Sequence, residues 1–329
     1  MTALRELVEP LTAGDPMSEQ KWVRASLRHL SRRLGEAGHR ASPPTVRRLL
    51  KTHGYRLHAN TKQLEAGAAH PDRDPQFQYI AAQRQAFRTA GQPEISVDTK
   101  KKELIGCFKN AGRVWSQAAT RVNAHDFRQE ALGRAVPYGI YEPRHNRGTV
   151  YVGQSADTPH FAVDMLVRWW VEEGQAAFPT ARELLILADG GGSNSARSRV
   201  WKQQLQAQLC DRYGLAVTVC HYPTGCSKWN PIEHRLFGPI SANWVGQPLT
   251  SWETMLGCLR GTTTETGLSV RAALHPDRYA TGERVSDAEL ATLNLDRHVV
   301  CPAWNYTLRP RSPASPAPAL AHPHRELVL

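Results

Sequence analysis

An uninterrupted apolar run in the middle of the chain constrains the fold more than any other feature. Residues 184–188 contain only leucine, isoleucine and alanine, so they lack the polar alternation of a strand that has one face in water. A run of this kind is typical of a strand that is covered on both faces, as in the sheet of an α/β protein. Asp189 and three glycines follow it directly, at the strand end where open α/β sheets hold their functional sites.

Segments on either side of the run predict the rest of such a sheet. Their patterns predict strands at residues 95–98, 104–108, 135–141, 149–152 and 215–219, and helices at 161–173 and 195–213. We expect 104–108 to be the hairpin partner of 95–98. The order of strand, helix and strand after this hairpin predicts an α/β fold, with a mixed sheet and helices on both faces. Beyond residue 240, only a helical pattern near 252–259 is assigned.

Residues 1–60 predict a small all-α DNA-binding domain. Apolar residues at helical spacing indicate a helix over 18–36, and Ser42 followed by two prolines suits the start of a second helix that Gly54 ends. This is the outline of a helix-turn-helix. An ordinary helical hairpin with a solvated basic face fits the same pattern, but 11 Lys and Arg against 5 Asp and Glu favour DNA. The candidate DNA contacts on the second helix are Arg47, Arg48 and Lys51.

The whole chain divides into four parts. Residues 1–60 form the predicted DNA-binding domain, 61–92 a polar linker with a helix, 93–308 the α/β domain, and 309–329 a disordered tail rich in proline and alanine. The formal net charge of +11 favours a polyanionic partner, with nucleic acid as the first candidate. No apolar run approaches the roughly 18 residues of a membrane span, and the first residues do not resemble a signal peptide.

Three carboxylates at the ends of predicted elements are the candidate catalytic residues and metal ligands. Asp98 ends a short strand, Asp189 ends the apolar run, and Glu233 lies at a helix start. Carboxylate oxygens suit Mg²⁺ or Mn²⁺, and two such ions can stabilise both the attacking and the leaving oxygen of a phosphodiester. The pattern therefore indicates phosphoryl transfer on a nucleic acid.

Each acid also has a structural interpretation that the pattern leaves open. Asp189 followed by glycine is a common turn pair. Glu233 fits the third position of a capping box that begins at Asn230, and Asp98 fits a surface ion pair with Lys100 or Lys102. Because each acid alone is weak evidence, the hypothesis depends on whether the three side chains converge.

Basic and aromatic residues flank two of the acids and are the candidate contacts for a DNA end. A lysine run alone is usually a solvated surface, but a cation and an aromatic ring beside a carboxylate suit DNA. His221 and His234 are candidates for proton transfer, although a lone histidine more often has only a structural hydrogen bond. Cys220, His221 and Cys226 lack a fourth ligand at zinc spacing. The candidate contacts are Lys100, Lys101, Lys102, Lys109, Arg113, Lys228 and Trp229.

Four blocks of sequence, at residues 95–106, 188–194, 227–237 and 262–268, closely resemble the DDE transposases of the ISAzo-type insertion-sequence family, which have a Rhodopirellula-type transposase DDE domain. The resemblance extends over about residues 15–308. It implies a ribonuclease-H-like catalytic fold, in which Asp98, Asp189 and Glu233 would be the catalytic triad.

The resemblance also implies a function. The protein would recognise the terminal inverted repeats of its own insertion sequence through residues 1–60, and its DDE domain would cut these ends and join them to target DNA with two Mg²⁺ or Mn²⁺ ions. It would act as a homo-oligomer on double-stranded DNA, in the bacterial cytoplasm at the nucleoid. Relatives usually begin with a further DNA-binding segment, so one alternative is a truncated, inactive remnant that binds the repeats and inhibits transposition. Another is a metal-dependent nuclease that does not join strands.

Overall fold

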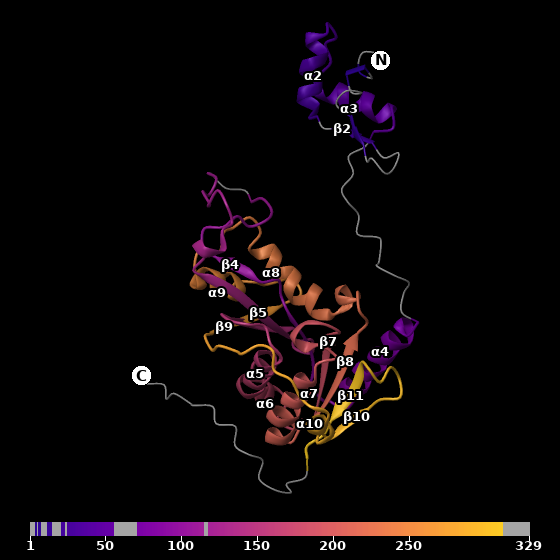
Figure 1. Cartoon of the computed structure of the whole chain (residues 1–329), viewed down its shortest axis with the longest axis vertical. Helices are drawn as coiled ribbons and strands as arrows, with labels where there is room; N and C mark the ends of the chain where they lie inside the picture. The colour runs from indigo at the N-terminus through magenta and orange to yellow at the C-terminus, as the bar shows by residue number, and fades with distance from the viewer. Residues whose placement is uncertain are drawn as a thin grey trace. The chain divides into compact units, whose positions relative to one another are not determined.

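The computed structural model describes residues 4, 6–7, 12–14, 21–23, 25–55, 71–114 and 118–311 of the chain. These residues belong to two compact units, Met1–Ala66 and Gly67–Leu329, and Figure 1 draws both units. Part of the predicted linker and most of the predicted tail lie outside the described residues.

The first unit is not all-α as predicted, because its described residues include a two-stranded sheet as well as helices. Strands β1 (Thr12–Gly14) and β2 (Lys21–Val23) pair antiparallel, and helices α2 (Leu27–Glu36) and α3 (Pro43–Thr52) follow them. The helix that we predicted over residues 18–36 begins only at Leu27, because residues 21–23 are extended against β1. The start of the second helix after Ser42 is confirmed.

Serine caps and a small apolar core stabilise this unit. The hydroxyl oxygens of Ser26 and Ser42 accept hydrogen bonds from the backbone N–H groups of His29 and Thr45, which satisfies donors that a helix start leaves free. The two helices then pack through their apolar faces. The buried residues of this core are Leu4, Leu30, Leu34 and Val46.

The second unit is built on one mixed sheet (Figure 1). Its strands are β3 (Glu94–Thr99), β4 (Glu103–Ile105), β5 (Gly133–Glu142), β6 (Arg147–Gly153), β7 (Glu183–Asp189), β8 (Ala216–Tyr222), β9 (Ser269–His275), β10 (Leu295–Arg297) and β11 (Asn305–Leu308). Among the described residues the order is β10-β11-β8-β7-β3-β5-β6-β9, and β4 pairs with β5 beside this path. Strand β7 is parallel to β3 and β8, whereas β5 is antiparallel to β3 and β6.

Helices cover both faces of this sheet. They are α4 (Arg73–Thr89), α5 (Pro159–Trp169), α6 (Gln175–Ala177), α7 (Arg199–Leu205), α8 (Gly238–Asn243), α9 (Trp252–Arg260) and α10 (Asp287–Ala291), with the 3₁₀ or π segments η2 (Arg128–Glu130), η3 (Trp170–Gly174), η4 (Gly192–Asn194), η5 (Gln206–Asp211), η6 (Ser227–Trp229) and η7 (Glu233–Phe237). Helices α5 and α7 pack on one face, and α4, η7 and α9 on the other. The predicted α/β fold, with a mixed sheet and helices on both faces, is confirmed. No helix in the described ranges has both the length and the apolar character that crossing a membrane requires.

The apolar run at 184–188 lies within β7, between β3 and β8. Leu184 and Ile186 pack into the core that includes α5 and α7, while Leu185 and Leu187 pack toward α4. Every residue of the run is at most 1% exposed, and burying a leucine or isoleucine side chain contributes roughly 1.5–3 kcal/mol. The prediction that this strand is covered on both faces is confirmed.

The predicted hairpin between residues 95–98 and 104–108 is wrong. Strand β4 pairs with the first half of β5, in a register that aligns Glu103 with Ala135. Strand β3 cannot accept β4, because its two edges are already taken by the second half of β5 and by β7. A sequence pattern can indicate that short strands exist, but it does not show which strand edges are free to pair.

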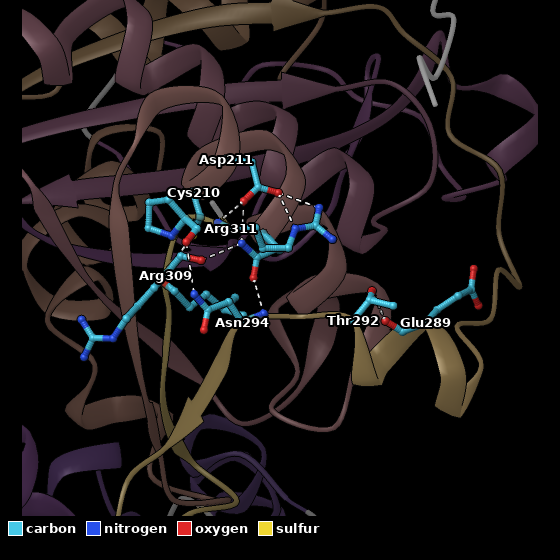
Figure 2. Close-up of polar contacts among 10 residues, drawn as sticks. Cys210, Asp211, Glu289, Thr292, Asn294, Arg309 and Arg311 are labelled. Atoms are coloured by element: carbon cyan, nitrogen blue, oxygen red, sulfur yellow. Dashed lines mark hydrogen bonds and ion pairs between the residues drawn. The ribbon is translucent and has the colours of Figure 1, made fainter. Parts of the chain in front are cut away.

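The part of the chain beyond residue 240, which the sequence left largely unassigned, adds strands at both edges of the sheet. Strand β9 pairs with β6, and the pair β10 and β11 extends the sheet beyond β8. Figure 2 shows that the end of the described chain is also held in place. The guanidinium group of Arg311 donates to Oδ2 of Asp211 over 2.6 and 2.9 Å, and the amide of Asn294 donates to the carbonyl oxygen of Pro310. Residues 309–311, which we predicted to begin the tail, are therefore folded.

Candidate active site

Two of the three predicted acids lie side by side at the carboxyl ends of neighbouring strands. The register pairs Val97 of β3 with Ala188 of the parallel strand β7, so Asp98 and Asp189 come next at the same level. Neighbouring parallel strands have their carboxyl ends on the same side of a sheet. The carboxyl groups of Asp98 and Asp189 therefore lie together. The two groups interact, and the negative charge of Asp189 helps to raise the pKa of Asp98.

Glu233 reaches the same place from the helical segment η7. Gly139 is the cross-strand partner of Asp98, and a Cβ atom at this glycine would lie 2.5 Å from Cε1 of Phe237 and 3.0 Å from Cδ1 of Ile232. The missing side chain therefore lets η7 pack closely against β5 beside Asp98. The carboxyl group of Glu233 is then close enough to that of Asp98 to help raise its pKa.

Burial and neighbouring negative charges raise the pKa values of Asp98 and Asp189. Burial raises the pKa of Asp98 to about 8, and the charges of Asp189 and Glu233 add to the rise. Burial also raises the pKa of Asp189; a hydrogen bond from Asn230 opposes this rise and the charge of Glu233 adds to it. Carboxylates forced together where water is scarce are a donor set that a hard divalent cation stabilises. The carboxyl groups suit Mg²⁺ or Mn²⁺ by their chemistry. Within the described ranges, however, no three His, Cys, Asp or Glu side chains are arranged so that they could bind a metal ion together.

The lysines next to Asp98 pair with other acids. Nζ of Lys102 lies 3.2 Å from Oδ2 of Asp157, and Nζ of Lys100 lies 4.0 Å from Oε1 of Glu103. The surface ion pair that the pattern allowed for Asp98 is therefore not formed. The carboxyl group of Asp98 interacts with the two other acids instead.

The capping box that the pattern allowed at Glu233 is not formed either. The segment η7 begins without a hydrogen bond from a capping side chain. The amide of Asn230, the expected cap, donates to Oδ1 of Asp189 over 3.0 Å and to the carbonyl oxygen of Val97 over 3.4 Å. The sequence shows Asn230 only as a cap residue, because its partners are distant in the chain.

A groove of about 1040 Å³ opens at Asp98 and Asp189, and Glu233 is not among the residues that line it. Asp98 and Asp189 line it together with the glycines at 190–192 and with Asp157. Asp157 is a fourth carboxyl group that the sequence did not single out, and its Oδ1 accepts a hydrogen bond from the hydroxyl of Thr99 over 3.0 Å. Its position shortly after the strand predicted at 149–152 is the signal that could have revealed it.

His221 is a buried structural residue. Its Nδ1 donates to the carbonyl oxygen of Asp189 over 2.9 Å, and its Nε2 lies 3.2 Å from the hydroxyl of Tyr306. Burial lowers the pKa of His221 to about 4, so the ring is neutral at physiological pH. Its hydrogen bond to Asp189 holds the end of β7 in place. His234, the other candidate for proton transfer, is exposed.

The side chains that we predicted to contact DNA differ in their exposure to solvent. Lys100 is buried, with Nζ 4.9 Å from the ring centroid of Trp244. Trp229 is 53% exposed and stands edge-on to Phe77, with the ring centroids 6.0 Å apart. Lys102 is half-buried beside Asp157. The exposed members are Lys101, Lys109, Arg113 and Lys228 in the second unit, and Arg47, Arg48 and Lys51 in the first.

Three of these lysines surround a second cavity, of about 260 Å³. The basic residues come from the segment after β3, from the turn after β4, from η2 and from the start of β5. Two arginines that the sequence did not single out complete the basic lining. The basic residues of this cavity are Lys101, Lys102, Lys109, Arg128 and Arg134.

Comparison with known proteins identifies the family. The family described as Rhodopirellula transposase DDE domain matches residues 3–310, which confirms the resemblance carried by the four sequence blocks. No curated protein matches the chain. Similar solved structures include the Mos1 transposase paired-end complex with left transposon end, at 12% identity and a TM-score of 0.40, and the Mos1 strand transfer complex, at 12% and 0.41. Each comparison covers 77% of this chain and 67% of the other. Because the family match spans most of the sequence and all three acids, the chain belongs to the Rhodopirellula transposase DDE domain family.

Proposed function

We propose that this protein cuts DNA at the terminal inverted repeats of its own element and joins the ends to target DNA, with Asp98, Asp189 and Glu233 as catalytic carboxylates. The proposal is supported by the neighbouring ends of β3 and β7, which bring Asp98 and Asp189 together, and by the charge interactions of Glu233 with both carboxyl groups. Membership of the DDE transposase family supports both the reaction on DNA and the need for a divalent metal ion.

In the proposed site, the three carboxylates would hold two Mg²⁺ or Mn²⁺ ions, which supply charge stabilisation for the attacking and leaving oxygens. The protein keeps these acids together in a place of low hydration, where each charge has a large effect. The buried ammonium group of Lys100 lies near enough for its charge to interact with that of Glu233. It would therefore stabilise the anionic site from within rather than contact DNA at the surface.

The exposed cations and Trp229 would contact DNA beside this site. The basic cavity suits a strand phosphate, because it gathers five cationic side chains with only two acidic ones, Glu103 and Asp126. The exposed ring of Trp229 would stack on a base near the cleaved end. Two copies of the protein, each on one transposon end, would form a homo-oligomer on the DNA.

The proposed reaction is tested with purified protein, terminal-repeat DNA and Mg²⁺ or Mn²⁺. We expect cleaved ends and joined products, and both should disappear when a chelator removes the cation. Nicking without joined products would contradict the transposase and indicate a nuclease. Repeat binding and intact Mn²⁺ binding without cleavage would indicate an inactive remnant.

Replacing the exposed cations of α3 is expected to weaken binding to terminal-repeat DNA. If each of Arg47, Arg48 and Lys51 contacts one phosphate, the triple alanine variant should reduce the slope of log affinity against log salt by about 3, since each contact contributes about 0.9. Arg33→Ala is the matched control, because Arg33 lies on α2 with Nε 3.7 Å from a carboxylate oxygen of Glu36. Equal slopes for the triple variant and the wild type would contradict the assignment of α3 as the DNA-contacting helix.

A further inference from the structure

A short chain of hydrogen bonds connects the three elements that carry the acids. Ser96 of β3 is 1% exposed and Asn230, between β8 and η7, is fully buried. The backbone N–H of Ile232 donates to Oγ of Ser96 over 3.1 Å, and the hydroxyl of Ser96 donates to Oδ1 of Asn230. The amide of Asn230 then donates to Oδ1 of Asp189 over 3.0 Å.

These bonds leave only one orientation for the side-chain amide of Asn230. The carbonyl oxygen of Val97 and the carboxylate of Asp189 can only accept hydrogen bonds, so both must lie against the nitrogen of Asn230, and the hydroxyl of Ser96 then donates to its oxygen. The oxygen of Asn230 must therefore face Ser96, and its nitrogen must face Asp189 and the carbonyl oxygen of Val97. A rotated amide would place oxygen against oxygen at Asp189.

The chain of bonds bears on all three acids. Ser96 and Asp98 are two residues apart on β3 and lie on the same face of the strand. Ile232, which Ser96 holds by its N–H group, directly precedes Glu233. Asp189 has one carboxylate oxygen engaged by a neutral donor, which leaves its other oxygen for a cation and limits rotation of the group.

We propose that Asn230, anchored by Ser96, is a positioning residue that holds Asp189 and η7 at the spacing from Asp98 that a divalent cation needs. The inference rests on the proposed function, because it concerns the same carboxylates. Residues that orient metal ligands through hydrogen bonds typically contribute about 10- to 100-fold to metal affinity. The effect of Asn230 should be of that size and should be visible without DNA.

The test measures Mn²⁺ binding to the DNA-free full-length protein by isothermal titration calorimetry. Asn230→Ala is expected to weaken Mn²⁺ binding by about 10- to 100-fold. Asn305→Ala is the matched control, because Asn305 is also fully buried and its amide pairs with that of Gln76 rather than with a carboxyl group. The control should lower the unfolding temperature as Asn230→Ala does, but should leave Mn²⁺ affinity within about twofold of the wild type.

Ser96→Ala is the second variant, and it serves if Asn230→Ala does not fold. It removes one oxygen atom and frees the amide of Asn230 to rotate, so Mn²⁺ affinity should fall by about 3- to 10-fold. In the double variant, the loss should be smaller than the sum of the two single losses, because Ser96 acts partly through the amide of Asn230 and partly through Ile232. Additive losses of metal affinity, or unchanged affinity in either single variant, would overturn the positioning role.

Asp189→Asn separates this inference from the proposed function. If the wild type binds Mn²⁺ and Asp189→Asn abolishes binding, the carboxylate site stands, and unchanged affinity in Asn230→Ala then overturns the positioning role alone. If Asp189→Asn binds Mn²⁺ as well as the wild type does, the proposed site is wrong and the positioning role is overturned with it.

Discussion

Asp98→Asn is expected to lower the rate of Mn²⁺-dependent cleavage of terminal-repeat DNA by more than about 100-fold, because even a residue that only orients a metal ligand contributes up to about 100-fold. The amide has the same shape as the carboxyl group but lacks the negative charge that the proposed site requires. Binding to the repeat DNA should be unchanged, because the substitution alters no surface cation. Single-turnover cleavage and a gel-shift assay measure the two quantities.

Asp157→Asn is the matched control for this prediction. Asp157 lines the same groove, but its carboxylate is engaged by Lys102 and Thr99. We expect its loss to slow cleavage by less than about tenfold, the lower end of the effect of an orienting residue. Cleavage that survives in Asp98→Asn but disappears in Asp157→Asn would reassign the catalytic acid.

Trp201→Ala is expected to lower the free energy of unfolding of the second unit by about 3–5 kcal/mol, the usual cost of truncating a buried tryptophan. Trp201 of α7 is fully buried, and its Nε1 donates to the hydroxyl of Tyr306 on β11 over 2.9 Å. The substitution removes a large apolar contact and leaves a hydroxyl without its donor. Urea unfolding followed by circular dichroism measures the change.

Trp229→Ala is the corresponding control, because that indole is 53% exposed. Its loss should cost less than about 1 kcal/mol of stability, as for most surface substitutions. It should nevertheless weaken binding of cleaved repeat ends if the ring stacks on a base. Equal destabilisation by the two tryptophan substitutions would contradict the described packing of α7 against β11.

The central strand and the α/β class could be predicted because their signals are local. A run such as 184–188 excludes a water-facing strand by composition alone, and Asp189 at its end marks the functional edge. The convergence of Asp98 with Asp189 required only the rule that parallel strands end together. The position of Glu233 was harder to predict, because it depends on Gly139. Only the folded structure shows that a side chain at Gly139 would keep η7 from packing there.

Other features depend on contacts between distant residues and could not be predicted from the sequence. The partner of β4 is decided by which edges of β3 are occupied. The pairing of β11 with β8 joins Tyr306 to Val219 across a long stretch of chain. Asn230 suits a helix cap by its neighbours, and only the fold brings Asp189 to its amide.

Anomalous diffraction from crystals of the protein with Mn²⁺ and terminal-repeat DNA tests the central claim most directly. The account predicts manganese peaks among the carboxyl groups of Asp98, Asp189 and Glu233, at about 2.1 Å from their oxygens, the distance of tightly bound small divalent cations. Manganese bound elsewhere, with these three carboxyl groups uncoordinated, would contradict it.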